Sequence, residues 1–213
     1  MQISIKGGIN VAKERVVYGF VRRKIELLDE ETAWSRGMLA KLRRGIGKQP
    51  GAVPDIWEIT LADAPEEWHS NKYGTASSAE LAVHTALTLY ALHRQGKLRS
   101  MSISGKTEDG KSAGDSFGAA AARLVQPDGS NLNAIKRRFD AVATAAEFTE
   151  LSRHARGIVQ LLKAADQPMD YPQFADDLYI FQIPGYDDGI RLRWGEDFYR
   201  TLKVTDGKED EAK

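Results

Sequence analysis

The sequence predicts an all-α protein, made of two packed helical bundles joined by a mobile loop that is rich in glycine and serine. Apolar residues recur three and four positions apart in most segments, a spacing that gives a helix one buried face. No region shows a sustained alternation of apolar and polar residues, so no half-buried strand is expected. The composition of residues 97–114 separates two helical halves and indicates the connecting loop.

These observations predict four parts: an N-terminal bundle over 11–96, a flexible loop over 97–114, a C-terminal bundle over 115–204 and a disordered polar tail over 205–213. The chain has 213 residues, of which 42% are hydrophobic, and can therefore build a substantial core. No apolar run approaches the length of a membrane span, and the beginning of the sequence lacks the apolar stretch of a signal peptide. We therefore expect no membrane contact.

The N-terminal bundle is expected to contain helices over 11–28, 32–46 and 79–95, with short helices after Asp55 and Pro65. Ser77 and Glu80 have the spacing of a capping box, in which each side chain satisfies a free backbone N–H of the other residue. This pair predicts the start of the third long helix, and Gly96 predicts its end.

The C-terminal bundle is expected to contain helices over 117–125, after Asn131, over 151–162, over 170–181 and over 187–203. In the second of these, Ile135, Phe139 and Val142 follow the spacing of one helix face. Arg137 lies on the opposite face, because each residue turns the helix by about 100°.

The helix over 32–46 is strongly basic on one side. Met38, Leu39 and Ile46 lie within about 60° of Leu42 and form the face that is expected to be buried. The other side and the residues that follow it carry Arg36, Lys41, Arg43, Arg44 and Lys48. No Asp or Glu lies between Thr32 and Pro54. Such a surface attracts polyanions, although a solvated helix face with no specific partner explains it equally well.

The net charge of the chain is zero, but the charge is sorted into blocks. Residues 55–69 are acidic, 136–156 are basic, 157–189 are acidic and 190–204 are basic. A neutral protein with segregated charge can present different faces to different partners, as a subunit of an assembly does.

The sequence offers no reaction centre, and we expect no catalytic residue, metal or cofactor. The absence of cysteine excludes disulfides, thiol catalysis and zinc–thiolate sites, and it fits a reducing cytoplasm. His84 and His93 fall on opposite faces of one helix and cannot share a metal there. The pairs Asp176-Asp177 and Asp187-Asp188 are explained by a helix surface and a helix start, or alternatively by a cation.

The order of motifs along the chain is more specific than any single motif. The series runs Leu42-Arg-Arg44, Pro54, Trp57, Phe117-Gly118, Arg137-Arg-Phe139, Leu151-x-x-His154-x-Arg156, Asp170-Tyr171, Asp177-Leu178, Trp194 and Phe198-Tyr199. In this order the sequence resembles the CasB family, the small subunit of the type I-E CRISPR surveillance complex Cascade. The resemblance covers residues 16–61 and 116–202, whereas 62–115 look longer than the family core.

The resemblance implies a non-enzymatic helical subunit in the cytoplasm of a prokaryote. It implies contact with the Cascade backbone and large subunits, with CRISPR RNA and with a second copy of the chain. The family is held to stabilise the R-loop by binding the displaced single-stranded target DNA with a basic surface. By position, the family's basic residues correspond to Arg43, Arg44, Arg137, Arg138, Arg153 and Arg156.

With the remaining basic positions of the two bundles, the predicted nucleic-acid-binding residues are Arg36, Lys41, Arg43, Arg44, Lys48, Arg137, Arg138, Arg153, Arg156, Arg191 and Arg193. One alternative remains, in which the chain is a helical protein–protein adaptor whose arginines pair with acidic partner surfaces. A metal-dependent enzyme built on the aspartates is a third reading.

Overall fold

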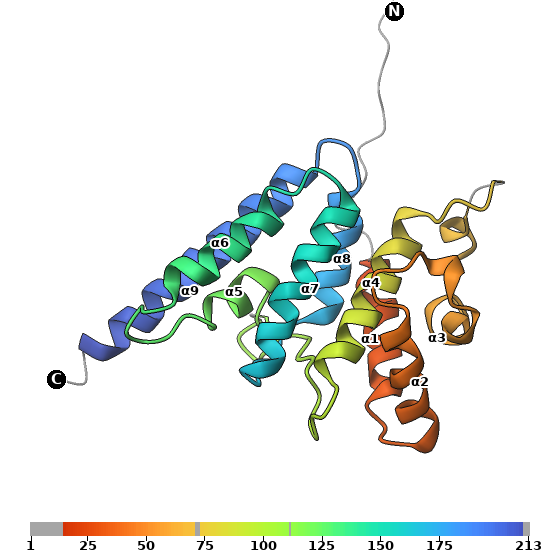
Figure 1. The fold of residues 1–213 in the computed structure, drawn as a ribbon, viewed down its shortest axis with the longest axis horizontal. Coiled ribbons are helices and arrows are strands. Elements are labelled where there is room, and N and C mark those ends of the chain that lie inside the picture. Colours follow the sequence, from red (N-terminus) through yellow and green to blue (C-terminus); the bar gives the residue numbers. More distant parts are fainter. Residues whose placement is uncertain (1–14, 71–72, 111, 211–213) are drawn as a thin grey trace, which may run out of the picture.

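A computed structural model of the chain is all-helical, which confirms the predicted fold class (Figure 1). The structure describes residues 15–70, 73–110 and 112–210, with residues 203–210 described as backbone only. Within these ranges there is no strand, and the two backbone bridges are isolated. Residues 11–14 of the first predicted helix lie outside the described part of the chain.

In the N-terminal half, the described residues 15–70 and 73–96 contain four α-helices and three short 3-10 helices. The α-helices are α1 (Val16–Leu28), α2 (Ala33–Arg44), α3 (Trp57–Thr60) and α4 (Ser78–His93). The 3-10 helices are η1 (Pro50–Ala52), η2 (Pro54–Ile56) and η3 (Glu66–Trp68). The short helices expected after Asp55 and Pro65 are therefore present.

In the C-terminal half, the described residues 112–210 contain five α-helices, close to the predicted ranges. They are α5 (Phe117–Ala122), α6 (Leu132–Ala143), α7 (Phe148–Ala164), α8 (Tyr171–Phe181) and α9 (Asp187–Asp210). We expected the last helix to end near Lys203 and a disordered tail to follow. Instead, α9 continues to Asp210, while residues 211–213 lie outside the described part.

Helix α4 is the centre of the fold. It packs against α1 and α2 on one side and against α7 and α8 on the other (Figure 1). Its residues are buried nearly all round, as expected for a helix with neighbours on several faces. The predicted capping box fixes its start: Ser77 Oγ accepts from the Glu80 backbone N–H, and the Glu80 carboxylate accepts from the Ser77 backbone N–H at 2.7 Å.

The two halves share one core. Helix α8 packs on both α1 and α4, and the buried apolar side chains form a single cluster that contains residues from each half. A group of stacked or tilted aromatic rings joins α5, α6, α8 and α9, and it consists of Phe117, Phe139, Phe174, Trp194 and Phe198. The division into two bundles at the loop remains a prediction.

The loop over 97–114 is anchored rather than freely mobile at its first half. Met101 is completely buried, and its carbonyl accepts from the backbone N–H of Met169 at 3.2 Å. Ile103 N–H in turn donates to the Met169 carbonyl at 3.1 Å. The loop therefore pairs with the segment before α8, a tertiary contact that its glycine- and serine-rich composition did not indicate.

Candidate nucleic-acid interface

Helices α6 and α7 pack side by side and place their basic residues on the outside. Ile135, Phe139 and Val142 are buried on α6, whereas Arg137, as its helical spacing predicted, and Arg138 are exposed. Likewise on α7, the buried face holds Leu151, Ala155, Ile158, Val159 and Leu162, and leaves Arg153 and Arg156 exposed. The two helices thus bury their apolar faces and present guanidinium groups to solvent.

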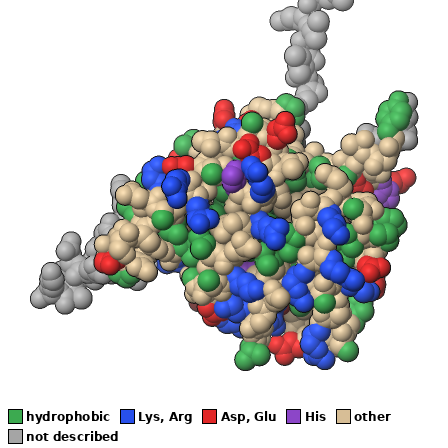
Figure 2. Space-filling view, in the orientation of Figure 1, with side chains coloured by type: hydrophobic (Ala, Val, Ile, Leu, Met, Phe, Trp, Pro, Cys, Tyr) green, Lys and Arg blue, Asp and Glu red, His purple; other side chains and the backbone are tan. Residues whose placement is uncertain are grey.

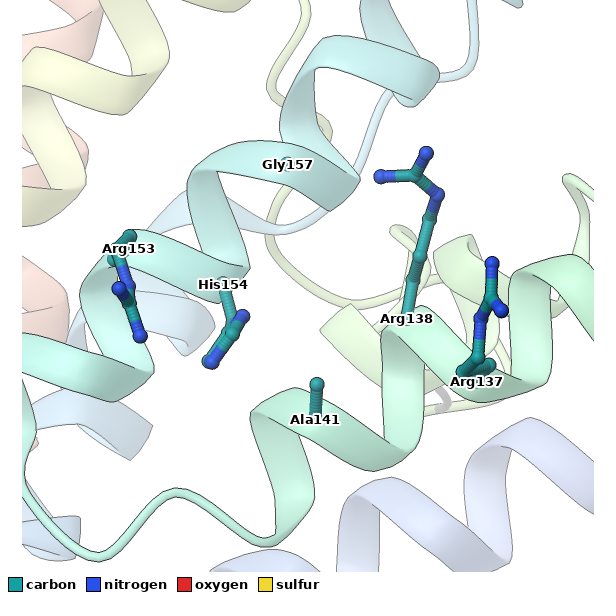
Figure 3. Close-up of a pocket in the computed structure, with 6 residues that line it drawn as sticks. All are labelled: Arg137, Arg138, Ala141, Arg153, His154 and Gly157. Atoms are coloured by element: carbon teal, nitrogen blue, oxygen red, sulfur yellow. The ribbon is translucent and has the colours of Figure 1, made fainter.

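A pocket of about 400 Å³, which we call the basic pocket, lies between these helices. It is lined by Arg137, Arg138, Ala141, Arg153, His154 and Gly157 (Figure 3). In Figure 3, Arg138 extends from α6 toward α7, and Arg153 and His154 project from α7. None of the carboxylates that the structure describes lines this pocket.

The arginines of the basic pocket are free of strong ion pairs. Arg137 and Arg138 form no ion pair with any residue that the structure describes. The guanidinium of Arg153 comes no closer than 3.9 Å to Glu150, and its side chain is 72% exposed. Because no carboxylate neutralises Arg137 and Arg138, these groups are available to an anionic ligand.

A second pocket of about 700 Å³, which we call the mixed pocket, adjoins the first. It is formed by residues 46–49 after α2, by the middle of α4 and by the first half of α7. Arg153 lines both pockets, and Lys48 and Arg156 line the mixed pocket. The fold therefore brings together basic residues from α6, α7 and the segment after α2. Figure 2 shows Lys and Arg side chains spread over this face from α6 across α7 to α2, with acidic side chains mostly toward its edges.

The basic helix α2 buries the face that the sequence predicted, with Met38, Leu39 and Leu42 inside. Lys41 and Arg43 are half-buried. Arg36 and Arg44 are exposed, but each has a local partner: Arg36 donates to the backbone carbonyl of Glu31, and Arg44 forms an ion pair with Asp55 at 3.1 Å. An exposed pair of this kind is weak, so Arg44 can exchange Asp55 for another anion.

Comparison with known proteins shows the family to which the chain belongs. The family model for the CRISPR-associated protein Cse2 matches residues 38–199. The chain belongs to the Cse2 family. This membership confirms the resemblance inferred from the order of motifs, and the matched range contains all the predicted basic residues except Arg36.

Solved structures of CasB proteins share the fold of this Cse2 chain. CasB from Thermobifida fusca is 30% identical, with coverage of 86% of this chain and 97% of that one and a TM-score of 0.68. CasB from M. ruber is 18% identical, with coverage of 91% and 97% and a TM-score of 0.58. A chain of a CRISPR RNA-guided surveillance complex is 16% identical, with coverage of 92% and 99% and a TM-score of 0.68. A search of curated proteins finds no match.

Two predicted site residues of this Cse2-family chain are engaged by carboxylates of their own surroundings. Arg191 pairs with Asp187 and Asp188 and donates to the carbonyl of Ala145 at 2.9 Å. Arg193 pairs with Asp177, which is completely buried. These contacts hold α9 in place. A nucleic-acid contact by Arg191 or Arg193 would have to compete with them.

The aspartates considered as a cation site lie in different environments. Asp176 and Asp177 are buried, contrary to the helix surface that we considered, and burial raises the pKa of Asp177 to about 6. Asp187 and Asp188 lie in the first turn of α9, where negative charge is favourable. In the described part of the chain no group of three or more His, Asp or Glu residues is arranged to hold a metal.

His84 and His93 are both buried on α4, and burial lowers the pKa of each, for His93 to about 4. Their ring nitrogens approach the Gly45 carbonyl at 3.0 Å and the Tyr171 hydroxyl at 3.1 Å, respectively. His93 therefore packs against Tyr171, whereas His84 is buried in the lining of the mixed pocket. The sequence analysis did not select His154 as a site residue, and the structure places it in the lining of the basic pocket. No helix that the structure describes is long and apolar enough to cross a membrane.

Proposed function

We propose that this chain is a non-catalytic, nucleic-acid-binding subunit of Cascade, an RNA-guided antiviral surveillance complex. In this role it stabilises the R-loop by binding the displaced DNA strand through the basic face of α6 and α7. The observation that carries the proposal is the basic pocket, whose arginines from two helices meet no lining carboxylate. Membership of the Cse2 family and the fold shared with a chain of a CRISPR RNA-guided surveillance complex support it.

The energetics suit a subunit of this kind. An R-loop is close to balance, because the guide–target duplex is about as stable as the DNA duplex that it replaces. Modest binding of the displaced strand can therefore shift the equilibrium toward the open state. Contacts to phosphates carry no base identity, so this binding is expected to be largely independent of sequence.

The same proposal assigns the chain its partners: the Cascade backbone and large subunits, CRISPR RNA and a second copy of the chain. The basic residues of α2 stand apart from the basic pocket in sequence, and they suit either the strand or an acidic surface of a neighbouring subunit. If all the arginines meet protein only, the chain is the adaptor considered above. Measurement of single-strand binding separates these readings.

The test is a titration of the full chain with single-stranded DNA at several salt concentrations. Each phosphate contact contributes about −0.7 to the slope of log K against log salt. The double variant Arg137→Ala/Arg138→Ala is expected to reduce the magnitude of this slope by about 1.4 and to weaken binding. Circular dichroism checks that the helices remain, as expected for two exposed side chains without an ion pair.

The double variant Arg22→Ala/Arg23→Ala is a matched control. These residues are also adjacent and exposed, but they lie on α1 and line neither pocket. We expect their removal to leave the slope unchanged. If both double variants lost the same amount of affinity and salt slope, the loss would reflect only the lower net charge of the chain. That result would overturn the assignment of the binding surface to α6 and α7. A parent chain without affinity for single-stranded DNA would favour the adaptor.

A further inference from the structure

The mixed pocket differs in chemistry from the basic pocket. Its lining has an apolar part, which includes Leu81, Leu89 and Phe148, and a polar part formed by the buried side chains of His84, Thr85 and Thr88, which we call the polar floor. Lys48, Arg153 and Arg156 bring positive charge to its lining, and Glu147 and Glu150 bring negative charge. Its volume of about 700 Å³ falls within the range of ligand pockets, roughly 300–1,000 Å³.

Phe148 is the unusual residue of this pocket. It is half-buried at the start of α7, and it lines the pocket. The other phenylalanines that the structure describes each have a ring neighbour or a cation over the ring, whereas Phe148 has neither among those residues. Phe148 packs partly against the core and also lines the pocket, and an aromatic ring in a pocket lining is a stacking surface for a flat ligand.

The floor adds an unsatisfied polar group. His84 Nε2 donates to the carbonyl of Gly45 at 3.0 Å, which leaves Nδ1 as an acceptor. This Nδ1 is buried and has no hydrogen-bond partner among the residues that the structure describes. A pocket with an aromatic wall and a polar floor suits a ligand that is flat, apolar on its faces and polar at its edge.

The charged side chains beside the mixed pocket favour a ligand that carries negative charge. Glu150 accepts from the backbone N–H of Ala146 at 3.1 Å and faces Arg153 at 3.9 Å, so part of its charge is offset. Arg156 has no ion pair with any described residue, and Arg153 links the mixed pocket to the carboxylate-free basic pocket. Arg153 and Arg156 therefore offer positive charge beside the mixed pocket to the phosphates of a strand that is bound along the basic pocket.

We propose that the mixed pocket receives one unstacked base of the bound single strand, stacked on Phe148, while the flanking phosphates lie against Arg153 and Arg156. This inference rests on the proposed function and adds a base contact to it. The contact is largely independent of base identity, because every base has a π-face. An apolar side chain of a partner protein is the competing occupant, but it would leave the polar floor and the neighbouring cations without a role.

The experiment compares the full chain bound to a single-stranded oligonucleotide with the same chain bound to an abasic strand of equal length and charge. We expect the parent chain to prefer the strand with bases by about tenfold, within the range measured for one stacked base. In Phe148→Leu, which keeps apolar bulk but loses the ring, this preference is expected to disappear. In Phe148→Tyr, which keeps the ring, it is expected to remain.

Thermal melting of both variants checks the fold, and the ratio of the two affinities removes any general loss of binding. Equal affinity of the parent chain for the two strands would overturn the base pocket and leave it to a protein side chain. Loss of the preference in Phe148→Tyr, or its persistence in Phe148→Leu, would overturn the role of the ring. If the parent chain binds both strands in a salt-dependent way but does not prefer the strand with bases, only this inference is contradicted. If it binds neither strand, the proposed function is contradicted as well.

Discussion

Trp194 donates its indole N–H to the carboxylate of Asp177 at 2.6 Å, and both side chains are completely buried between α8 and α9. The same carboxylate accepts from the amide of Gln173 on its own helix and from Arg193 on α9. A buried carboxylate is unfavourable unless it is hydrogen-bonded and paired, and here it has donors from two helices. This contact ties α9 to α8 inside the aromatic core that supports α6.

The first prediction concerns the pH dependence of stability. Burial raises the pKa of Asp177 from 3.8 to about 6, and Arg193 acts in the opposite direction. The folded protein therefore binds this proton more tightly than the unfolded chain does. This tighter proton binding adds to the free energy of unfolding. The contribution is fully present below pH 3.8 and is lost as the pH rises through about 6.

The variant Asp177→Asn removes this titration. Between these two pH values, we expect its free energy of unfolding to fall less steeply with rising pH than that of the parent chain, by up to about 1 kcal/mol per pH unit. Urea denaturation across the window measures the slope. Asp170, whose pKa burial also raises to about 6, stays in both proteins and provides the common background. Parallel profiles would show that Asp177 does not titrate in this range.

The second prediction concerns Arg193, which the sequence assigned to the nucleic-acid surface. Arg193→Ala leaves the buried Asp177 without its cationic partner. We expect a loss of about 2 kcal/mol in the free energy of unfolding, less than for a fully buried pair because Arg193 is 44% exposed. Arg200→Ala on the same helix is the control, since its pair with Asp197 is exposed and its loss is expected to change stability by less than about 0.5 kcal/mol.

Binding of single-stranded DNA provides the second readout for Arg193. At a temperature where the variant is folded, we expect its salt slope to equal that of the parent chain. A smaller slope for Arg193→Ala, with stability unchanged, would place this residue in the interface and contradict the structural role.

Much of the fold followed from local patterns. The spacing of Ile135, Phe139 and Val142 predicted the buried face of α6, and the Ser77–Glu80 pair predicted the start of α4. These predictions succeeded because a helix face and a helix cap are set by residues within a few positions of one another. The end of α9 was missed, because the polar composition beyond Lys203 indicated a tail whereas the helix continues.

The candidate site was only partly predictable, for a related reason. The helical spacing showed that Arg137 points outward, but not that it lines one pocket with Arg153, which depends on how α6 packs on α7. Nor could it show that Arg193 meets Asp177, sixteen positions earlier on another helix. Phe148 was missed because a single aromatic at a helix start has no local pattern that distinguishes a wall of a pocket from a core residue.

The third prediction tests the cap of the central helix. Ser77→Ala removes the side chain that accepts from the Glu80 backbone N–H, and we expect a loss of about 1 kcal/mol in the free energy of unfolding. Ser78→Ala is the neighbouring control, because Ser78 is the first residue of α4 and its carbonyl, not its side chain, accepts from Gln182. Chemical denaturation of the two variants should separate them. Equal stability would mean that the capping box contributes little.

The final prediction tests how closely α5 and α9 approach. A methyl group built on Gly118 would lie 2.1 Å from the backbone carbonyl oxygen of Trp194, an atom that no side-chain rotation can move away. Gly118→Ala therefore forces α5 and α9 apart. This movement also disrupts the contact between the rings of Phe117 and Trp194. We expect a loss of about 3 kcal/mol in the free energy of unfolding.

Gly37→Ala is the matched control, with an effect of opposite sign. Gly37 lies in the middle of α2 with nothing within 4 Å of an added methyl group, so alanine is expected to stabilise the helix by about 1 kcal/mol. Guanidinium denaturation of both variants gives the two differences on one scale. A Gly118→Ala variant as stable as the parent chain would mean that α5 and α9 are farther apart than the structure has them. The stabilisation by Gly37→Ala would then show that the measurement itself detects a change of this size.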